Sequence, residues 1–422
     1  MVQIVRRTFV IGATSAIVAG AARRAGAAST AGTGSIDSIL KKAVETKQIP
    51  GVVALAATDK GTIYQGAFGS RSLAPGGAAM TMDSVFWIAS MTKAMTSTAA
   101  MQMVEQGKLS LDQPISTILP ELASVQVLDG FDASGAPKLR PARRPITLRH
   151  LLTHTAGFTY DIWDAKTARY EKLTGIPGII SCKDDALRTP LAFDPGERWE
   201  YGINIDWAGK AVERVSGQKL GAYLQEHLFE PTGMTSTSFK LSPAQRTRLV
   251  QMHSRQPDGS LTPIEFEIPQ DPEFQMGGGG LYSTASDYMK FCQLFLHNGR
   301  AESGAQVLRP ETVALMSQNQ MGDITVTSLK TVDPGSSLDA EFFPGMPKNW
   351  STAFMINTED APTGRSAGSL AWAGLANTFF WIDPKRRVAG VILMQFLPFV
   401  DGPAIQTFAD FETETYKILR AA

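Results

Sequence analysis

The residues best suited to chemistry are a serine and a lysine three positions apart, Ser90 and Lys93. Ser90 follows the apolar run 85–89 and begins a predicted helix over 91–106, whose residues from 94 to 104 are apolar or small almost all round. Such a helix is predicted to be buried, together with Lys93. Burial lowers the pKa of an amine because the charged form loses its hydration. Since residues i and i+3 share a helix face, Lys93 can act as a base toward the Ser90 hydroxyl.

The same Ser-x-x-Lys spacing occurs twice more, at Ser38 with Lys41 and at Ser216 with Lys219. Ser38 lies on the polar side of a predicted amphipathic helix, and Ser216 precedes Gly217, a residue type that commonly ends helices. Both pairs are therefore predicted to lie on the surface. The local pattern also permits a structural interpretation of Ser90, as a helix N-cap followed by a lysine whose ammonium reaches solvent.

A second serine motif, Gly364-Arg365-Ser366-Ala367-Gly368, matches the G-x-S-x-G pattern of hydrolases that use serine, histidine and aspartate. That chemistry needs a strand before the serine, a helix after it and a histidine later in the chain. No helix is predicted after Ser366, and all five histidines precede it: His150, His154, His227, His253 and His297. The motif is predicted to be a hairpin loop without catalytic function.

Other patterns in the chain indicate no phosphate or metal site. Gly277–Gly280 is not followed by the Lys-Ser/Thr of a phosphate-binding loop, so it is predicted to allow a close backbone approach. His150 and His154 have a spacing compatible with zinc but no evident third ligand, and are predicted to pack within a helix. The basic run 138–144 is predicted to be a solvated loop. No metal ion and no organic cofactor is expected.

The composition is that of a globular protein without a dominant charge. The chain has 422 residues, of which 43% are hydrophobic and 19% charged, and its 40 Lys and Arg balance 40 Asp and Glu. A neutral chain lacks the basic surface with which proteins bind phosphates, so nucleic acid is not expected as a partner. Two cysteines, Cys182 and Cys292, are too few for a disulfide framework, and their spacing does not decide whether they pair.

The elements that must position Ser90 are predicted from periodicity. Strands are predicted near both ends of the chain, at 52–56, 62–64, 353–356, 377–382 and 388–393. An amphipathic helix flanks them on each side, at 36–44 and 405–419. The middle of the chain has mainly helical periodicity. We therefore expect an α/β sheet domain built from 29–110 and 291–422, a helical domain from 111–290, and the active site at their junction.

Residues 1–28 resemble an export signal. Arg6 and Arg7 precede a weakly apolar run over 11–22, and 25–27 form an A-x-A cleavage pattern. Twin arginines before such a run are typical of Tat signals, so the mature chain is expected to begin near Ala28 in the periplasm or the medium. The alternative is a disordered tail. No stretch approaches the roughly 20 apolar residues of a membrane helix, so no stable membrane association is expected.

Several motifs occur in the order found in one family, namely Phe86–Lys93, Ile146–Phe158, Pro195–Tyr201 and Gly277–Thr284. Over 36–419 the chain resembles the class C β-lactamase superfamily and, within it, most resembles the family VIII carboxylesterases. The resemblance implies the fold of β-lactamases and penicillin-binding proteins. In that fold an antiparallel sheet is flanked by helices and joined to a mostly helical domain.

The resemblance also implies roles for single residues. Ser90 is the nucleophile and Lys93 its neighbouring base, while Tyr201 matches the tyrosine of the family's Tyr-x-Asn motif and acts as general base and later as general acid. Lys93 is expected to lower the pKa of Tyr201 by its charge. Which of the two holds the proton at rest stays open. The N–H groups of Ser90 and Leu375 are expected to form the oxyanion hole.

Two departures from the lactamase pattern favour esters over β-lactams. Ile203 takes the Asn position of Tyr-x-Asn, with Asn204 displaced by one residue, and Trp372-Ala373-Gly374 replaces Lys-Thr-Gly. The substrate thereby loses two polar anchors, which count heavily in discrimination. The residues expected to line the pocket for substrate are Trp372, Gly374, Phe158 and Tyr160.

The sequence therefore predicts a carboxylesterase that cleaves short-chain esters of small molecules through an acyl-enzyme on Ser90. Three alternatives stay open. They are a β-lactamase or D-Ala-peptide hydrolase with the same residues, an acyltransferase, and a ligand-binding protein without catalysis. The natural ester and the oligomeric state are not indicated by the sequence.

Overall fold

The computed structural model describes residues 30–421. The predicted export signal, residues 1–28, lies outside the described residues. Within them, Cys182 and Cys292 are both buried and free. No helix over 30–421 has both the length and the hydropathy needed to cross a bilayer.

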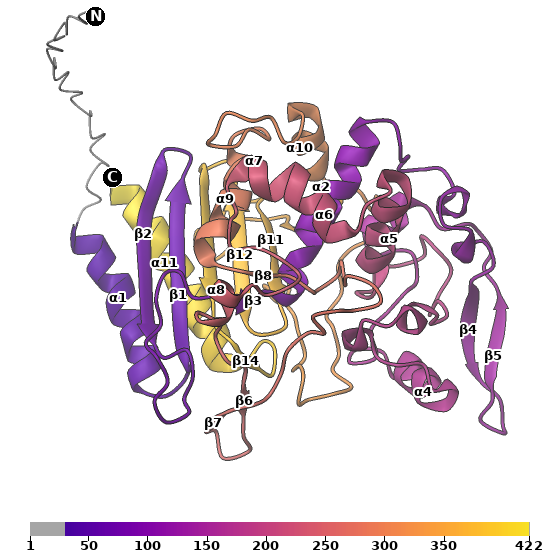
Figure 1. Ribbon diagram of the computed structural model, residues 1–422, viewed down its shortest axis with the longest axis horizontal. Coiled ribbons are helices and arrows are strands. Elements are labelled where there is room, and N and C mark those ends of the chain that lie inside the picture. The colour runs from indigo at the N-terminus through magenta and orange to yellow at the C-terminus, as the bar shows by residue number, and fades with distance from the viewer. Residues whose placement is uncertain (1–29, 422) are drawn as a thin grey trace, which may run out of the picture.

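A seven-stranded antiparallel sheet forms the centre of the fold, in the order β2-β1-β13-β12-β11-β10-β9 (Figure 1). Its strands are β1 (Gly51–Thr58), β2 (Gly61–Gly69), β9 (Lys348–Trp350), β10 (Met355–Asn357), β11 (Leu370–Gly374), β12 (Thr378–Asp383) and β13 (Val388–Leu393). The sheet joins the two ends of the chain, because β1 pairs with β13. The strands predicted from periodicity overlap β1, β2, β10, β12 and β13, although residues 353–354 and 377 lie outside the strands, and the predicted fold class is confirmed.

Helices cover both faces of this sheet. α1 (Thr30–Glu45) and α11 (Gly402–Ala421) pack together on one face, and α9 (Ala285–Leu296) packs against β1, β12 and β13 on the other (Figure 1). Every residue of β12 and β13 is buried, which explains their continuous apolar sequence. The expected domain boundary between residues 290 and 291 falls inside α9, a helix of the sheet layer.

The helix predicted after Ser90 consists of two parts. A single turn, η1 (Ala89–Met91), leads into α2 (Thr92–Glu105), which is buried from Thr92 to Met103. α2 packs against α5 (Asn204–Ser216) and α6 (Leu220–Leu224). The predicted burial of Lys93 therefore follows from helices on one side of α2 and the sheet on the other.

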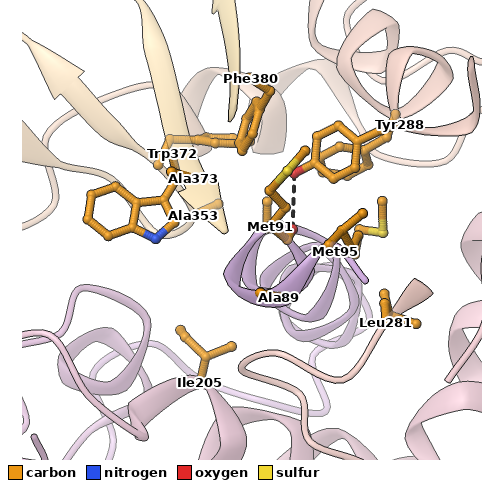
Figure 2. Packing of buried hydrophobic residues seen from close by; sticks show 14 of the residues in the cluster. Ala89, Met91, Met95, Ile205, Leu281, Tyr288, Ala353, Trp372, Ala373 and Phe380 are labelled. Atoms are coloured by element: carbon orange, nitrogen blue, oxygen red, sulfur yellow. Dashed lines mark hydrogen bonds between the residues drawn. The ribbon is translucent and has the colours of Figure 1, made fainter. Parts of the chain in front are cut away.

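The beginning of α2 packs between the sheet and the helical layer. Figure 2 shows Met91 facing the strands that carry Trp372 and Phe380, with Ile205 on the opposite side of the helix. The Tyr288 hydroxyl donates a hydrogen bond to the carbonyl oxygen of Met91 at 3.0 Å (Figure 2). The turn that carries Ser90 is thus held by packing from several distant segments.

The middle of the chain is mostly helical, and it also contains short strands that were not predicted. Its other helices are α3 (Leu148–Leu152), α4 (Ala165–Thr174), α7 (Glu230–Thr232) and α8 (Pro243–Arg246), with the short turns η2 (Ile115–Thr117), η3 (Pro120–Leu122), η4 (Ile179–Ser181), η5 (Asp184–Leu187) and η6 (Gln225–Phe229). Its strands are β4 (Gln126–Phe131), β5 (Pro137–Pro141), β6 (His253–Arg255), β7 (Leu261–Pro263) and β8 (Tyr282–Ser283). The remaining elements are β3 (Phe86–Trp87), which pairs with β8, α10 (Pro310–Met316), and β14 (Phe396–Leu397), which pairs with β6.

The structure corrects the prediction that the basic run 138–144 is a solvated loop. Its first part is not a solvated loop but belongs to β5, which forms a hairpin with β4 at the end of the molecule away from the large sheet (Figure 1). Arg140 forms ion pairs with Asp129 at 2.9 Å and with the fully buried Asp194 at 2.7 Å. A buried carboxylate needs such a partner, and the local sequence pattern does not show it.

Candidate active site

The nucleophile candidate lies on a strained turn. Ala89, directly before Ser90, has φ of 43°, in the left-handed region that residues with a side chain rarely adopt. Such strain persists where the surroundings enforce it, and it is common at functional sites. Here the neighbours supply hydrogen bonds, from Ile88 N to Leu281 O at 3.0 Å and from the Trp87 indole to Gly279 O at 2.6 Å.

Lys93 is buried beside Ser90 as predicted. Its side chain is 1% exposed, and Nζ lies 3.2 Å from Ser90 Oγ. Nζ also donates to the Tyr160 hydroxyl at 2.9 Å and to the carbonyl oxygen of Gly278 at 2.5 Å. It lies 4.6 Å from the centre of the Tyr201 ring. These contacts aim the amine at the Ser90 hydroxyl.

The glycine run 277–280 supplies backbone to this site, and it fits the predicted close approach. Thr96 donates its hydroxyl to Gly277 O at 2.8 Å, next to the contact of Lys93 with Gly278. A Cβ on Gly278 would lie 2.5 Å from a carboxylate oxygen of Asp206. A side chain at this position would therefore displace the neighbouring groups.

Tyr201 lies next to Ser90 and is held by Trp372. The indole N–H of Trp372 donates to the Tyr201 hydroxyl at 2.8 Å, and the Ser90 side chain is close enough to lower the pKa of the Tyr201 phenol. Its ring packs against His154 at 4.6 Å between ring centres. The structure therefore brings together Ser90, Lys93 and Tyr201, the three residues predicted to be catalytic.

The protonation states differ from one expectation. Burial lowers the pKa of Lys93 to about 7, although the nearby Asp206 carboxylate opposes this shift. Burial raises the pKa of Tyr201 well above its ordinary value, and its hydrogen bonds with Ser90 and Trp372 reverse only part of the rise. The expectation that Lys93 lowers the pKa of Tyr201 is wrong, because desolvation of the phenolate is the larger effect. Lys93 is the group that can act as a base near neutral pH.

A cavity of about 400 Å³ opens directly on Ser90. Most of its lining is apolar and comes from segments far apart in the chain. The lining includes Trp87, Ser90, Tyr160, Asp161, Ile162, Trp163, Ile179, Ile180, Phe266, Met276, Asp333, Ser336, Leu375 and Leu397. A small apolar molecule bound here would place its reacting atom against Ser90.

Of the four residues expected to line the substrate pocket, only Tyr160 lies in this lining. Phe158 lines a separate cavity of about 240 Å³ and stacks on Trp207. Trp372 acts through the Tyr201 hydroxyl instead. Gly374 keeps the backbone close, because a Cβ there would lie 2.3 Å from Ile88 O. Closeness to a motif in the sequence did not predict which side chains face the cavity. Neighbouring residues of an irregular segment point to different sides.

Leu375 lies in the cavity lining beside Ser90, and β11 packs against η1. The close approach of Gly374 to the carbonyl of Ile88 brings the end of β11 to the turn that carries the nucleophile. This placement is compatible with an oxyanion hole made by the N–H groups of Ser90 and Leu375, which stays a prediction.

The other candidate serines have different surroundings. Ser38 is exposed, and Ser216 ends α5 before Gly217, as predicted. Ser366 is buried in a loop that leads into β11 without a helix, and its N–H donates to Asp383 at 2.9 Å. The Arg386 guanidinium donates to Ser366 Oγ at 3.3 Å. No histidine contacts this serine, among the residues that the structure describes.

Sequence reasoning missed Asp206, which is 1% exposed and lies in the first turn of α5. The available signal was an acidic residue between Ile205 and Trp207, within the apolar face of an amphipathic helix. It also missed the contact of Tyr160 with Lys93. The two histidines contact different partners: His150 Nδ1 accepts the N–H of Thr147, and His154 packs on Tyr201.

Comparisons with known proteins agree with this architecture. The family model described as Beta-lactamase matches residues 36–413. The chain is 33% identical over 409 residues to the monacolin J acid methylbutanoyltransferase of Aspergillus terreus, covering 90% of this chain and 95% of that protein. It is 32% identical over 381 residues to the lovastatin esterase of Penicillium rubens, covering 87% of this chain and 94% of that protein.

Among solved structures, a variant of simvastatin synthase from Aspergillus terreus superposes with a TM-score of 0.80 at 30% identity, covering 93% of this chain and 96% of that one. These relatives are hydrolases and acyltransferases of one fold. The resemblance inferred from the ordered motifs is confirmed. The chain belongs to the Beta-lactamase family, with the fold of the serine β-lactamases and penicillin-binding proteins, and is an enzyme of the serine hydrolase and acyltransferase type.

Proposed function

We propose that this chain is a serine acyltransferase that moves a short acyl group from an activated ester to the hydroxyl of an apolar small molecule. Ester hydrolysis is the competing reaction. One observation carries the proposal: Ser90, Lys93 and Tyr201 meet at the end of an apolar cavity. The sequence alone placed hydrolysis first. The names of the relatives favour acyl transfer, since one is a methylbutanoyltransferase and another an esterase.

The proton positions support a two-step reaction. Neutral Lys93 takes the Ser90 proton as Oγ attacks the donor carbonyl, and the proton passes through the Tyr201 hydroxyl to the leaving oxygen. The acceptor alcohol then attacks the acyl-enzyme and gives its proton to Lys93, from which it returns to Ser90. Water in place of the alcohol gives the acid. The molecules that bind in the cavity therefore determine which acyl donor reacts and whether an alcohol or water attacks the acyl-enzyme.

The cavity supports an uncharged, apolar acceptor. Among its lining residues, Asp161 and Asp333 carry charges, and both charges are negative. Burial and the Asp333 carboxylate raise the pKa of Asp161. A carboxylate on the substrate would meet repulsion here and find no cation at the rim among these residues. An apolar acceptor, by contrast, displaces water from the wall formed by Trp163, Phe266 and Met276.

The positions that hold β-lactams in related enzymes support this choice. Ile203 is buried, and the displaced Asn204 is fully buried as well. The amide nitrogen of Asn204 donates to Phe158 O at 3.0 Å and lies 3.1 Å from His154 Nδ1, so this nitrogen is occupied within the protein. Neither side chain is available to bind the amide of a β-lactam.

The test is competition between water and an alcohol for one acyl-enzyme. With p-nitrophenyl butyrate as donor, millimolar cyclohexanol should yield cyclohexyl butyrate at the expense of butyrate, as measured by gas chromatography. Glycerol, a polar alcohol, is the matched control and should yield little ester. Butyrate as the sole product at every cyclohexanol concentration would establish the esterase instead.

Two further measurements distinguish this enzyme from a β-lactamase and from a protein that only binds its ligand. Faster turnover of a chromogenic cephalosporin than of p-nitrophenyl butyrate would favour a β-lactamase. Absence both of turnover and of a fluorophosphonate adduct, seen by intact mass, would favour a ligand-binding protein.

We also propose that residues 1–28 direct export to the periplasm or the medium. Arg6 and Arg7 before the weakly apolar run support this proposal. In a bacterial host, fractionation should find a chain that begins near Ala28 outside the cytoplasm. Replacement of both arginines by lysine, Arg6→Lys with Arg7→Lys, should retain the chain in the cytoplasm.

A further inference from the structure

Asp206 is a buried carboxylate that the proposed reaction steps do not use. One oxygen, Oδ1, accepts the N–H of Gly278 at 2.8 Å. The other, Oδ2, accepts no hydrogen bond from the described residues. A buried carboxylate oxygen without a donor is costly, and burial raises the pKa of Asp206 to about 6, although the Lys93 charge and the Gly278 N–H oppose this rise.

The group whose charge acts on Asp206 is Lys93, on the other side of one peptide group. The carbonyl oxygen of Gly278 accepts the Lys93 amine at 2.5 Å, while the N–H of the same residue binds Asp206. Gly278 therefore connects the two charged side chains. No direct ion pair joins Lys93 to Asp206 in the described structure, because this glycine lies between them.

This spacing matters for a base. A carboxylate in direct contact would hold the lysine charged, as in a closed ion pair. Without any carboxylate, burial would make the amine a weak base that gains little from accepting a proton. A counter-charge one residue away stabilises the ammonium while leaving the amine free to face Ser90.

We propose that Asp206 is a positioning residue for Lys93. It anchors the Gly278 peptide that orients the amine toward Ser90, and it stabilises Lys93 each time that Lys93 gains the Ser90 proton. The inference rests on the proposed function only in taking Ser90 as the nucleophile.

The other titratable groups around this pair are neutral near pH 7. They are Tyr160 and Tyr201, whose pKa values burial raises, His154, whose pKa burial and the Lys93 charge lower, and Cys182, whose pKa burial and the Asp206 charge raise. Within the described residues, Asp206 is the charge that acts on Lys93. Its removal should therefore move the titration of Lys93 to lower pH, whereas the neighbouring phenols and the Cys182 thiol stay protonated near pH 7.

The test is the pH dependence of Ser90 phosphonylation by a fluorophosphonate, followed by intact mass from pH 5 to 9. Asp206→Asn keeps an oxygen for the Gly278 N–H and removes the charge. In Asp206→Asn, the pH at which the phosphonylation rate is half-maximal should decrease by about one unit, because the ammonium of Lys93 loses a stabilising charge. The maximal phosphonylation rate should fall about tenfold, because a weaker base deprotonates Ser90 less readily. Asp206→Glu keeps the charge and should keep the midpoint.

The matched control is Asp383→Asn, at a fully buried carboxylate that binds Ser366 N and the Tyr416 hydroxyl. It should lower the melting temperature and leave the midpoint unchanged. An unchanged midpoint in Asp206→Asn, or an equal shift in the Asp383 control, overturns the inference. If Asp206→Asn does not fold, Gly278→Ala, whose Cβ displaces the carboxylate, should shift the midpoint in the same direction, and an unchanged midpoint there overturns it equally.

Phosphonylation needs no acyl acceptor. If the wild type transfers no acyl group to an alcohol while Asp206→Asn shifts the phosphonylation midpoint, the proposed function is rejected and the inference about Asp206 is kept. Transfer with an unshifted midpoint would do the reverse.

Discussion

Two regions of this molecule contain a serine, a buried cation and a buried carboxylate, and they differ in how the charges are joined. The groups are Ser90, Lys93 and Asp206 in one region and Ser366, Arg365 and Glu412 in the other. In the second region the guanidinium forms two direct hydrogen bonds with the carboxylate, at 2.8 and 2.6 Å. In the first a glycine peptide separates the charges.

Whether the carboxylate touches the cation determines whether the cation is structural or can act as a base. The direct pair of Arg365 with Glu412 joins the loop before β11 to α11. Among the residues over 30–421, Lys93 has no direct counter-ion, so it can exchange a proton with Ser90. A buried cation thus becomes structural when its carboxylate touches it, and available as a base when the carboxylate is held one residue away.

The largest expected effect separates the two serines. Ser90→Ala should lower kcat/KM for p-nitrophenyl butyrate by roughly four orders of magnitude or more, because it removes the nucleophile. Ser366→Ala should leave the rate nearly intact. A comparable loss in both variants would contradict the distinction between the two regions.

The next effect concerns stability. Glu412→Gln should lower the free energy of unfolding by about 3–5 kcal/mol, since it leaves the buried Arg365 charge unpaired. Urea titration followed by circular dichroism measures this, with the exposed Glu311→Gln as control. The folded fraction should keep its kcat. A fall in kcat without a loss of stability would mean that this ion pair serves catalysis.

A smaller effect should appear at the hydrogen bond that holds Tyr201. Trp372→Phe removes the indole donor and should lower kcat about tenfold with little change in KM, because a hydrogen bond that contributes about 1.4 kcal/mol corresponds to this factor. Trp381→Phe is the matched control, since its indole N–H is buried in the adjacent strand and has no hydrogen-bond partner in the described part of the chain. Equal losses in both variants would indicate a packing effect alone.

An effect of similar size is the pH dependence of the wild type. The neutral form of Lys93 is the active one and its pKa is lowered to about 7, so kcat/KM should rise about tenfold from pH 6 to pH 8. It should not fall again below pH 9, because Tyr201 keeps its proton there. A rate that decreases with rising pH would assign the working proton to another group.

The part of the site that could be predicted is the part encoded locally. Ser90 and Lys93 lie within one helical turn, and the apolar residues after them indicate burial without knowledge of the fold. The β1–β2 hairpin and strand β13 follow from equally local patterns. Tyr201 was found through a family motif, because nothing in its own neighbourhood distinguishes it from a packed aromatic residue.

The wrong predictions concern the orientation of side chains and the surroundings that set a pKa. Phe158 and Tyr160 are two residues apart, yet only Tyr160 reaches the cavity on Ser90. Trp372 was expected to form a wall of the pocket and instead donates to a phenol. The pKa of Tyr201 moved opposite to the expectation, because its desolvation depends on all the segments that surround it.

By itself, the amino-acid sequence determined which chemical groups exist and which of them are neighbours on one helix. It placed a nucleophile and an amine on a buried turn and left out the polar anchors for β-lactams. Only the tertiary structure decided which carboxylate faces that amine, at what spacing, and which walls enclose the substrate. The physical reason is that these properties depend on dielectric surroundings and through-space distances between segments far apart in the chain, and neither quantity is written in local sequence.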